Sequence, residues 1–210
     1  MLKKRKINKT LVVGWLIVLC GIGTGIIPFF NNQKEIRIEE NKIEEFFDEE
    51  LVEKTIVNES ATSIKEEDTS KNNQTINYSM VLEIPKINLK KGLYDKNSKY
   101  NSVKYNIQIL KESDMPNVVN GNLILASHRG NSSVSYFNNL YKLSNGNQVY
   151  VYYNNVKYIY EITNMYEVEK TGTITIHRDR DETVIVLITC KKNENKQLVF
   201  IGNLVDKEDY

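Results

Sequence analysis

The sequence has few of the residues that build disulfide frameworks and metal sites. It has two cysteines, and Cys20 lies inside an apolar run, so Cys190 is the one thiol of the remaining chain. One thiol excludes both a disulfide framework and a thiol-rich metal site there. The two histidines, His128 and His177, do not have the spacing of a metal site. We therefore expect neither a metal nor a cofactor.

The sequence also lacks a strongly basic region beyond its first residues. The net charge is +5 over residues 1–30, −8 over 31–70 and +4 over 71–210, so the total of +1 is a cancellation. The basic residues of 71–210 are scattered along the sequence and do not cluster with aromatic residues, which is not typical of a nucleic-acid-binding surface. We expect no nucleic-acid partner.

Only one long hydrophobic run is present, "LVVGWLIVLCGIGTGIIPFF" over residues 11–30, and it carries no charge. Its length suits a helix crossing roughly 30 Å of hydrocarbon. A signal peptide would have a shorter apolar core and a small-residue cleavage site, which is not evident. Basic residues precede the run, which predicts a cytoplasmic tail over 1–10 and an extracellular location after Phe30. We therefore expect a single-pass protein of the cell membrane.

Residues 31–77 are acidic and polar and are interpreted as a stalk. The part "EIRIEENKIEEFFDEELVEK" has apolar residues at roughly helical spacing, which predicts a short amphipathic helix. The part "NESATSIKEEDTSKNNQTIN" has no periodicity and is typical of a flexible linker.

Residues 78–210 are typical of an all-β domain. Short runs such as "MVLEIPKINL", "NQVYVYY", "TITI" and "TVIVLITC" are rich in β-branched and aromatic residues and are separated by Asn, Gly and Ser. Asn154-Asn155 predicts a hairpin turn, because asparagine tolerates positive φ. Helical pattern is confined to residues 135–143, where "YFNNLYKL" predicts a helix packed on the barrel. Seven or eight short strands predict a closed or nearly closed barrel.

Two chemically useful side chains stand where strands end. His128 follows "NLILAS", and Cys190 ends "TVIVLITC". An imidazole beside a thiol makes that thiol a nucleophile near neutral pH. The alternative is a structural histidine and a buried cysteine acting as a small hydrophobe.

The order of these motifs resembles the sortase family, the membrane-anchored cysteine transpeptidases of Gram-positive bacteria. The resemblance rests on "LEIPKINL", "NLILASHRG" followed by "FNNLYKLSNGNQVYVYY", and "VIVLITC" followed by "LVFIGNLV". It extends from about Met80 to Val205 without large gaps.

The resemblance implies a closed β-barrel of about eight strands and thioester chemistry. Cys190 would attack the Thr–Gly bond of an LPxTG-like sorting signal, and His128 would act as general acid and base. The partners would be surface proteins bearing that signal and an amine, supplied by a peptidoglycan precursor or by a pilin lysine. The catalytic domain would comprise residues 78–210 on the extracellular face.

One position departs from the family pattern. Where the family places an arginine after the cysteine, this chain has Gln197, or Lys196 if the register is shifted by one. At most one of them faces the site, because successive strand residues point to opposite faces. Three alternatives remain open, of which we prefer the first. Gln197 acts as a neutral donor to the oxyanion, an arginine reaches in from another loop (Arg129, Arg178 or Arg180), or the protein is a weak or inactive binding module.

Two further polar groups have simple structural interpretations. "HRDRDE", which contains His177, is typical of a solvated loop, although it lies in the connection before the cysteine strand. Asp114 in "ESDMPN" is interpreted as a turn residue before the strand that leads to His128.

Overall fold

The structure is a computed structural model that describes residues 33–52 and 77–210. The predicted tail over 1–10, the predicted anchor over 11–30 and most of the predicted linker lie outside the described residues. Within the described ranges, no helix is both long enough and apolar enough to cross a membrane. Residues 33–52 form a helix, which confirms the amphipathic helix expected there. The chain divides into two compact units, Met1–Asn41 and Lys42–Tyr210.

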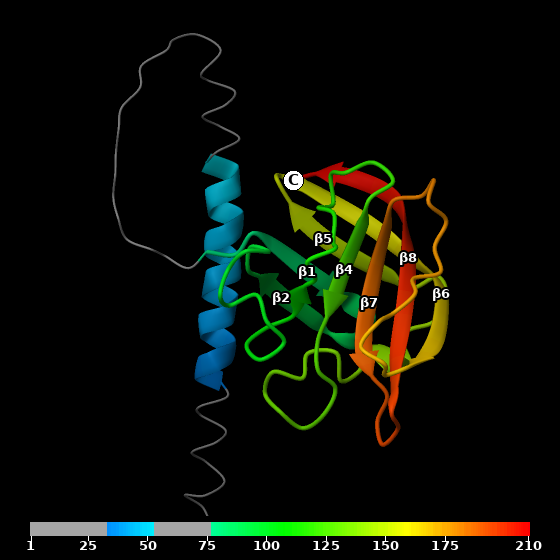
Figure 1. The fold of residues 1–210 in the computed structure, drawn as a ribbon. Coiled ribbons are helices and arrows are strands. Elements are labelled where there is room, and N and C mark those ends of the chain that lie inside the picture. The colour runs from blue at the N-terminus through cyan, green and yellow to red at the C-terminus, as the bar shows by residue number, and fades with distance from the viewer. Residues whose placement is uncertain (1–32, 53–76) are drawn as a thin grey trace, which may run out of the picture. The chain divides into compact units, whose positions relative to one another are not determined.

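The second unit contains a single eight-stranded sheet (Figure 1). Along the sheet the strands follow the order β2-β1-β5-β6-β8-β7-β4-β3. Their bounds are β1 Met80–Ile84, β2 Leu89–Leu93, β3 Gln108–Ile109, β4 Asn122–Ala126, β5 Gln148–Tyr153, β6 Val156–Glu169, β7 Val184–Cys190 and β8 Lys196–Asp209.

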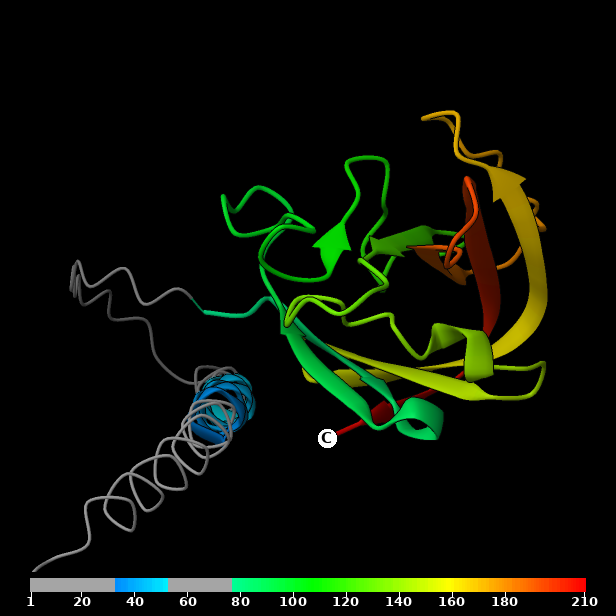
Figure 2. The ribbon, with the colours of Figure 1, turned by 90° about the horizontal axis from the view of Figure 1, so that it is seen from below.

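The sheet curves around a common interior to make a nearly closed barrel (Figure 2). Edge strands β2 and β3 do not pair with each other, so the fully closed barrel of our expectation is corrected to a nearly closed one. The buried side chain of Asn106, just before β3, donates to the Gly92 carbonyl oxygen of β2 at 2.8 Å. This side-chain bond spans part of the gap between the two edge strands.

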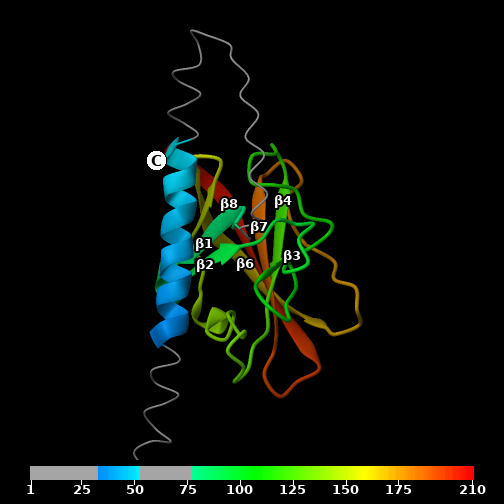
Figure 3. The same ribbon diagram turned by 90° about the vertical axis from the view of Figure 1, so that its left-hand side faces the viewer.

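Neighbouring strands β4 and β7 run parallel, whereas the other pairings in the sheet are antiparallel (Figures 1 and 3). The register pairs Asn122 with Val184 and Ala126 with Ile188. Parallel neighbours have their carboxyl ends at the same edge of the sheet. The residues that follow β4 and β7 are therefore brought to one end of the barrel.

Side chains of β7 alternate between two apolar layers, as the period-2 pattern of a strand requires. Ile185 and Leu187 point into the barrel and join its main core. The other layer, here called the aliphatic outer face, packs outside β4, β7 and β8. It consists of Ile124, Val184, Val186, Ile188, Val199 and Ile201. Ile174 and Ile176, from the connection between β6 and β7, cover this face.

The local predictions have mixed outcomes. The hairpin is confirmed, because Asn154 and Asn155 have φ of 51° and 59° between paired Tyr153 and Val156. The helix expected over 135–143 is wrong in extent: only the 3-10 turn η3, Leu140–Lys142, is helical, while Leu140 is buried in the core as expected. The run "TITI" is not a strand, because residues 173–176 lie across the aliphatic outer face instead of joining a sheet edge.

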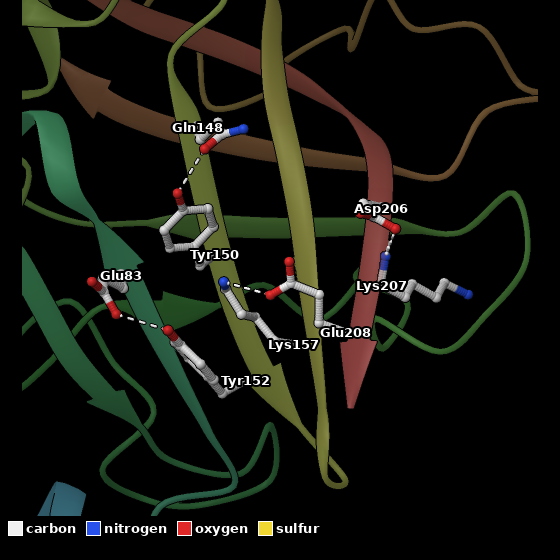
Figure 4. Close-up of polar contacts among 8 residues, drawn as sticks. All are labelled: Glu83, Gln148, Tyr150, Tyr152, Lys157, Asp206, Lys207 and Glu208. Atoms are coloured by element: carbon white, nitrogen blue, oxygen red, sulfur yellow. Dashed lines mark hydrogen bonds and ion pairs between the residues drawn. The ribbon is translucent and has the colours of Figure 1, made fainter. Parts of the chain in front are cut away.

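The opposite side of the barrel has an outer face of different character, here called the tyrosine outer face, built on β1, β5 and the ends of β6 and β8 (Figure 4). Tyr152 donates to Glu83 at 3.0 Å, and Lys157 binds Glu208 at 2.8 Å. Helix residues Ile43 and Phe46 pack with Tyr78 and Val81 beside this face.

Candidate active site

Cys190 is the last residue of β7 and the first of that strand to meet solvent. The six residues before it are buried, whereas Cys190 is half-buried. By the alternation of the strand it shares a face with Val184, Val186 and Ile188, which form the aliphatic outer face. The thiol therefore lies at the rim of this apolar layer and not inside the barrel core.

Gln197 is the direct neighbour of Cys190 across the β7–β8 ladder. Directly opposed residues of antiparallel strands point to the same face. The Gln197 amide is thus on the thiol's side of the sheet, in one row with Val168 of β6.

Lys196 points to the other face and is held there by charge. Its Nζ lies 3.6 Å from Glu167 Oε2, and Lys191 Nζ lies 2.7 Å from Glu167 Oε1 and 3.0 Å from Glu194 Oε1. The hydrogen bond from Lys191 lowers the pKa of Glu167, and the bond to Glu167 raises the pKa of Lys191. Of the two residues considered at the family's arginine position, only Gln197 shares a face with Cys190.

His128 comes to the same end through the parallel pairing of β4 with β7. The last ladder pair is Ala126 with Ile188, and the Ser127 N–H donates to the Ile188 carbonyl oxygen at 3.2 Å. His128 follows Ala126 by two residues, as Cys190 follows Ile188, so both residues come just after the last ladder pair. His128 is exposed. The parallel register thus brings His128 to the end of the barrel where Cys190 and Gln197 are paired.

A buried hydroxyl, not singled out from the sequence, ties the two strand exits together. Thr189 is 2% exposed, and its Oγ1 donates to the Ser127 carbonyl oxygen at 2.9 Å. Ser127 is also buried and directly precedes His128. A polar residue inside the apolar run just before the cysteine was the available signal, but its partner is 62 residues away and is fixed only by the fold.

The other arginines considered are placed differently. Arg178 Nη1 donates to the carbonyl oxygens of Asn120 at 3.1 Å and Glu182 at 3.0 Å. Both acceptors precede the starts of β4 and β7, so Arg178 is at the far end of β7, roughly 20 Å from Cys190 at the usual strand rise. Arg129 follows His128, and its guanidinium carbon is 4.6 Å from the ring centroid of Tyr141.

The two polar groups with structural interpretations also have defined partners. His177 is exposed, its backbone N–H donates to the Tyr166 hydroxyl at 3.0 Å, and the two rings meet edge to face at 5.0 Å. Tyr166 pairs with Val199, so His177 lies over the aliphatic outer face. Asp114 Oδ2 accepts from the N–H of Asn122 at 3.0 Å, which supports its interpretation as a turn residue before β4.

Chemically, the rim offers a partly exposed thiol, an imidazole and a neutral amide donor at one end of an apolar face. Such a set can support nucleophilic catalysis with proton transfer and stabilisation of an oxyanion. Within residues 33–52 and 77–210, no group of three or more His, Cys, Asp or Glu residues could hold a metal ion.

Several solved structures of sortases are similar to this chain. The chain superposes on the Clostridium perfringens Sortase D5 transpeptidase with a TM-score of 0.59 and 20% identity, covering 80% of this chain and 98% of that one. Listeria monocytogenes sortase A gives 0.54 and 19%, covering 63% and 90%. Streptococcus pneumoniae Sortase C gives 0.54 and 19%, covering 70% and 76%. At these identities the similarity establishes the fold alone.

Sequence comparison gives the family. None of the curated proteins matches this chain. The family model of the Sortase domain matches residues 82–205, which is more than half of the chain and includes both β4 and β7. The protein therefore belongs to the sortase family.

Proposed function

We propose that this protein is a cysteine transpeptidase that cleaves an LPxTG-like sorting signal and transfers the acyl group to an amine. The proposal is supported by the register, which pairs Cys190 with Gln197 on one face and sets the end of β4, two residues before His128, beside β7. The thiol is the nucleophile, His128 is the general acid and base, and Gln197 donates to the oxyanion.

In the first half-reaction, His128 accepts the thiol proton and the Cys190 sulfur attacks the carbonyl carbon of the scissile Thr–Gly bond. The carbon–nitrogen bond then breaks, and His128 gives a proton to the leaving amine. The products are a thioester on Cys190 and a released carboxy-terminal peptide. The half-buried position of the thiol at the edge of an apolar layer keeps it accessible while shielding one side of the thioester from water.

In the second half-reaction, an amine attacks the thioester carbon and passes a proton to His128. The carbon–sulfur bond breaks, an amide forms, and His128 returns the proton to the sulfur, which restores the thiol. In both steps the negative charge on the carbonyl oxygen accepts a hydrogen bond from the Gln197 amide. A neutral amide lacks the charge and planar fork of arginine, so transition-state stabilisation is weaker than a guanidinium would give.

The partners that fit this chemistry are surface proteins with a sorting signal and an acceptor amine from a peptidoglycan precursor or a pilin. A cell-membrane location, with the catalytic domain outside the cell, fits the apolar run over 11–30. Family membership supports this general arrangement, and the peptide panel described below identifies the sequence of the sorting motif.

The test is intact mass spectrometry of the purified full chain in detergent, mixed with a panel of LPxTG-like peptides, with and without an amine. We expect a covalent acyl adduct on wild type that an added amine converts into an amide product. Cys190→Ala forms no adduct, and the rate falls at least about a thousandfold, because no other nucleophile replaces the thiolate. Transpeptidation by Cys190→Ala would refute the proposal.

A second candidate function is a catalytically silent binding module, favoured by the missing arginine at Gln197. It predicts saturable binding of a sorting peptide with no adduct on either chain. A simple thiol hydrolase, in contrast, releases a free acid at the same rate whether or not an amine is added.

A further inference from the structure

A polar side chain stands at the border of the aliphatic outer face, on edge strand β3. Ile109 belongs to the main core inside the barrel, so Gln108, its neighbour in β3, points outward. Gln108 pairs with Ala126 of β4, which packs against the aliphatic outer face. Gln108 is therefore a half-buried amide beside this apolar layer.

A single row of side chains crosses the sheet from this amide to the opposite border of the face. The ladders pair Ala126 with Ile188 of β7, and Ile188 with Val199 of β8. Val199 in turn pairs with Tyr166 of β6. Cys190 is two residues beyond Ile188, so the thiol's row is about 7 Å further along the strand. A substrate that extends from Cys190 along the apolar face crosses the row of Gln108.

The two polar ends of this row differ in what they leave open to a ligand. The Tyr166 hydroxyl accepts from the His177 backbone N–H at 3.0 Å and donates to the Thr175 carbonyl oxygen at 3.1 Å. Gln108 Oε1 accepts from the Val103 N–H at 3.4 Å, whereas Gln108 Nε2 has no hydrogen bond with any of the described residues. The Gln108 amide thus keeps both of its N–H donors for a ligand.

A second amide side chain fixes the position of β3. Asn101 Oδ1 accepts from the Ile109 N–H at 2.7 Å, and Asn101 Nδ2 donates to the Ile109 carbonyl oxygen at 2.8 Å. An edge strand is a ready site for pairing with another chain, but at Ile109 the Asn101 side chain already takes both main-chain groups. A peptide on this side of the barrel therefore meets β3 through the Gln108 side chain, which is held on a fixed strand.

The proposed sorting signal contains an acceptor that matches this donor. In an LPxTG-like signal the proline precedes the scissile threonine by two residues, which span about 7 Å in an extended chain. With the threonine carbonyl carbon at Cys190 and the signal extended along the apolar face, the proline lies level with Gln108. Proline has a carbonyl oxygen and no backbone N–H, so it needs a donor and offers none. Over an apolar face that oxygen is costly to leave unpaired.

We propose that Gln108 is a specificity-determining residue that donates from Nε2 to the proline carbonyl oxygen of the sorting signal. Strand β4 lies between β3 and β7, so a signal bound over β4 is about one strand spacing, 4.8 Å, from β3. This inference rests on the proposed transpeptidase function and assigns a contact to its first substrate. The effect of Gln108 is on kcat/KM for the signal and not on the KM of the acceptor amine.

The first test compares two substitutions in the full chain. Gln108→Glu keeps an oxygen that accepts from Val103 but lacks the donor, and Gln108→Met lacks both. Each should lower kcat/KM for an LPxTG-like peptide about tenfold, because the proline oxygen loses its donor. The KM of the acceptor amine should not change. A loss in Gln108→Met alone would show that Gln108 only holds Val103, and would overturn the inference.

The second test locates the acceptor atom. In a modified peptide the residue after proline is replaced by its α-hydroxy acid, so the proline carbonyl belongs to an ester and is a weaker acceptor. This change should lower kcat/KM of wild type about fivefold, and it should have little further effect in Gln108→Glu, because the two changes remove one interaction.

The matched control is Gln148→Glu. Gln148 is an exposed glutamine whose Oε1 accepts from Tyr150 on the tyrosine outer face (Figure 4). This variant should respond to the ester as wild type does. Equal responses of wild type and Gln108→Glu to the ester would overturn the inference. Absence of any thioester on wild type would instead overturn the proposed function.

Discussion

The two outer faces of the barrel are covered in different ways. The aliphatic outer face is packed by isoleucines of the β6–β7 connection, and its six core residues are at most 4% exposed. The tyrosine outer face is covered beside β1 by helix residues, with Phe47 meeting Tyr152 and Tyr210 edge to face at 5.1 Å and 5.4 Å. Glu50 and Tyr210 are hydrogen-bonded at the same place.

The difference shows where a reactive group can stand. The aliphatic packing ends at the row of Val168, Gln197 and Cys190. The Cys190 thiol therefore has apolar side chains on one side and solvent on the other. The tyrosine face instead satisfies its polar groups by mutual hydrogen bonds and ion pairs (Figure 4). We infer that the first face supports chemistry and the second holds residues 42–52 to the barrel.

Apart from removal of the Cys190 thiol, the substitution expected to lower kcat most is at Gln197. Gln197→Ala should lower kcat about a hundredfold, because one donor to the oxyanion is removed. Lys196→Ala is the matched control, because the side chain lies on the opposite face, and it should change kcat less than about threefold. Equal losses in steady-state transpeptidation would show that position 197 has no special role.

Thr189 should have the next largest effect. Thr189→Val keeps the shape but removes the bond to Ser127, so His128 is less well positioned and kcat should fall about tenfold, with little change in KM. Leaving the Ser127 carbonyl oxygen unsatisfied should also lower the free energy of unfolding by about 1–3 kcal/mol.

Rescue distinguishes positioning from stability. Thr189→Ser keeps the hydroxyl that Thr189→Val lacks. Its kcat should be close to that of wild type even if its unfolding temperature is as low as that of Thr189→Val. If kcat follows the unfolding temperature in both variants, Thr189 is structural and does not position His128.

A third prediction separates the faces by stability. Phe46→Ala and Ile188→Ala each remove a buried side chain, and each should lower the free energy of unfolding by about 2–5 kcal/mol. Phe46→Ala should loosen residues 42–52 in hydrogen exchange and leave kcat unchanged, whereas Ile188→Ala should also lower kcat. A lower kcat in Phe46→Ala would contradict the separation.

The smallest effect expected is alkaline loosening of the tyrosine outer face. Burial, and then the hydrogen bond to Glu83, raise the pKa of Tyr152 above its usual value of 10.0. A raised folded pKa contributes stability that is present below pH 10 and lost as the pH rises through the folded value. The unfolding temperature should therefore drop above pH 10, and less so in Tyr152→Phe. An identical drop in the variant would assign the effect to other tyrosines, such as the buried Tyr160.

Much of the local structure was predictable because it depends on neighbours in sequence. The Asn154-Asn155 turn needs only residues that tolerate positive φ, and the helix over 33–52 follows from apolar spacing. The failures are where tertiary packing decides. Residues 135–143 have helical spacing, yet Phe137 and Leu143 are buried on either side of a single 3-10 turn. Residues 173–176 have strand composition but cover a face.

The sequence by itself determined the β-rich domain, the family resemblance, and the placement of His128 and Cys190 at strand exits. Only the tertiary structure decided that β4 lies parallel to β7, which brings two residues 62 positions apart to one level. It also decided that Gln197 and not Lys196 shares the thiol's face. The physical reason is the register of strand pairing. A shift of one residue moves every side chain of a strand to the opposite face of the sheet, and packing between segments distant in sequence determines which register forms.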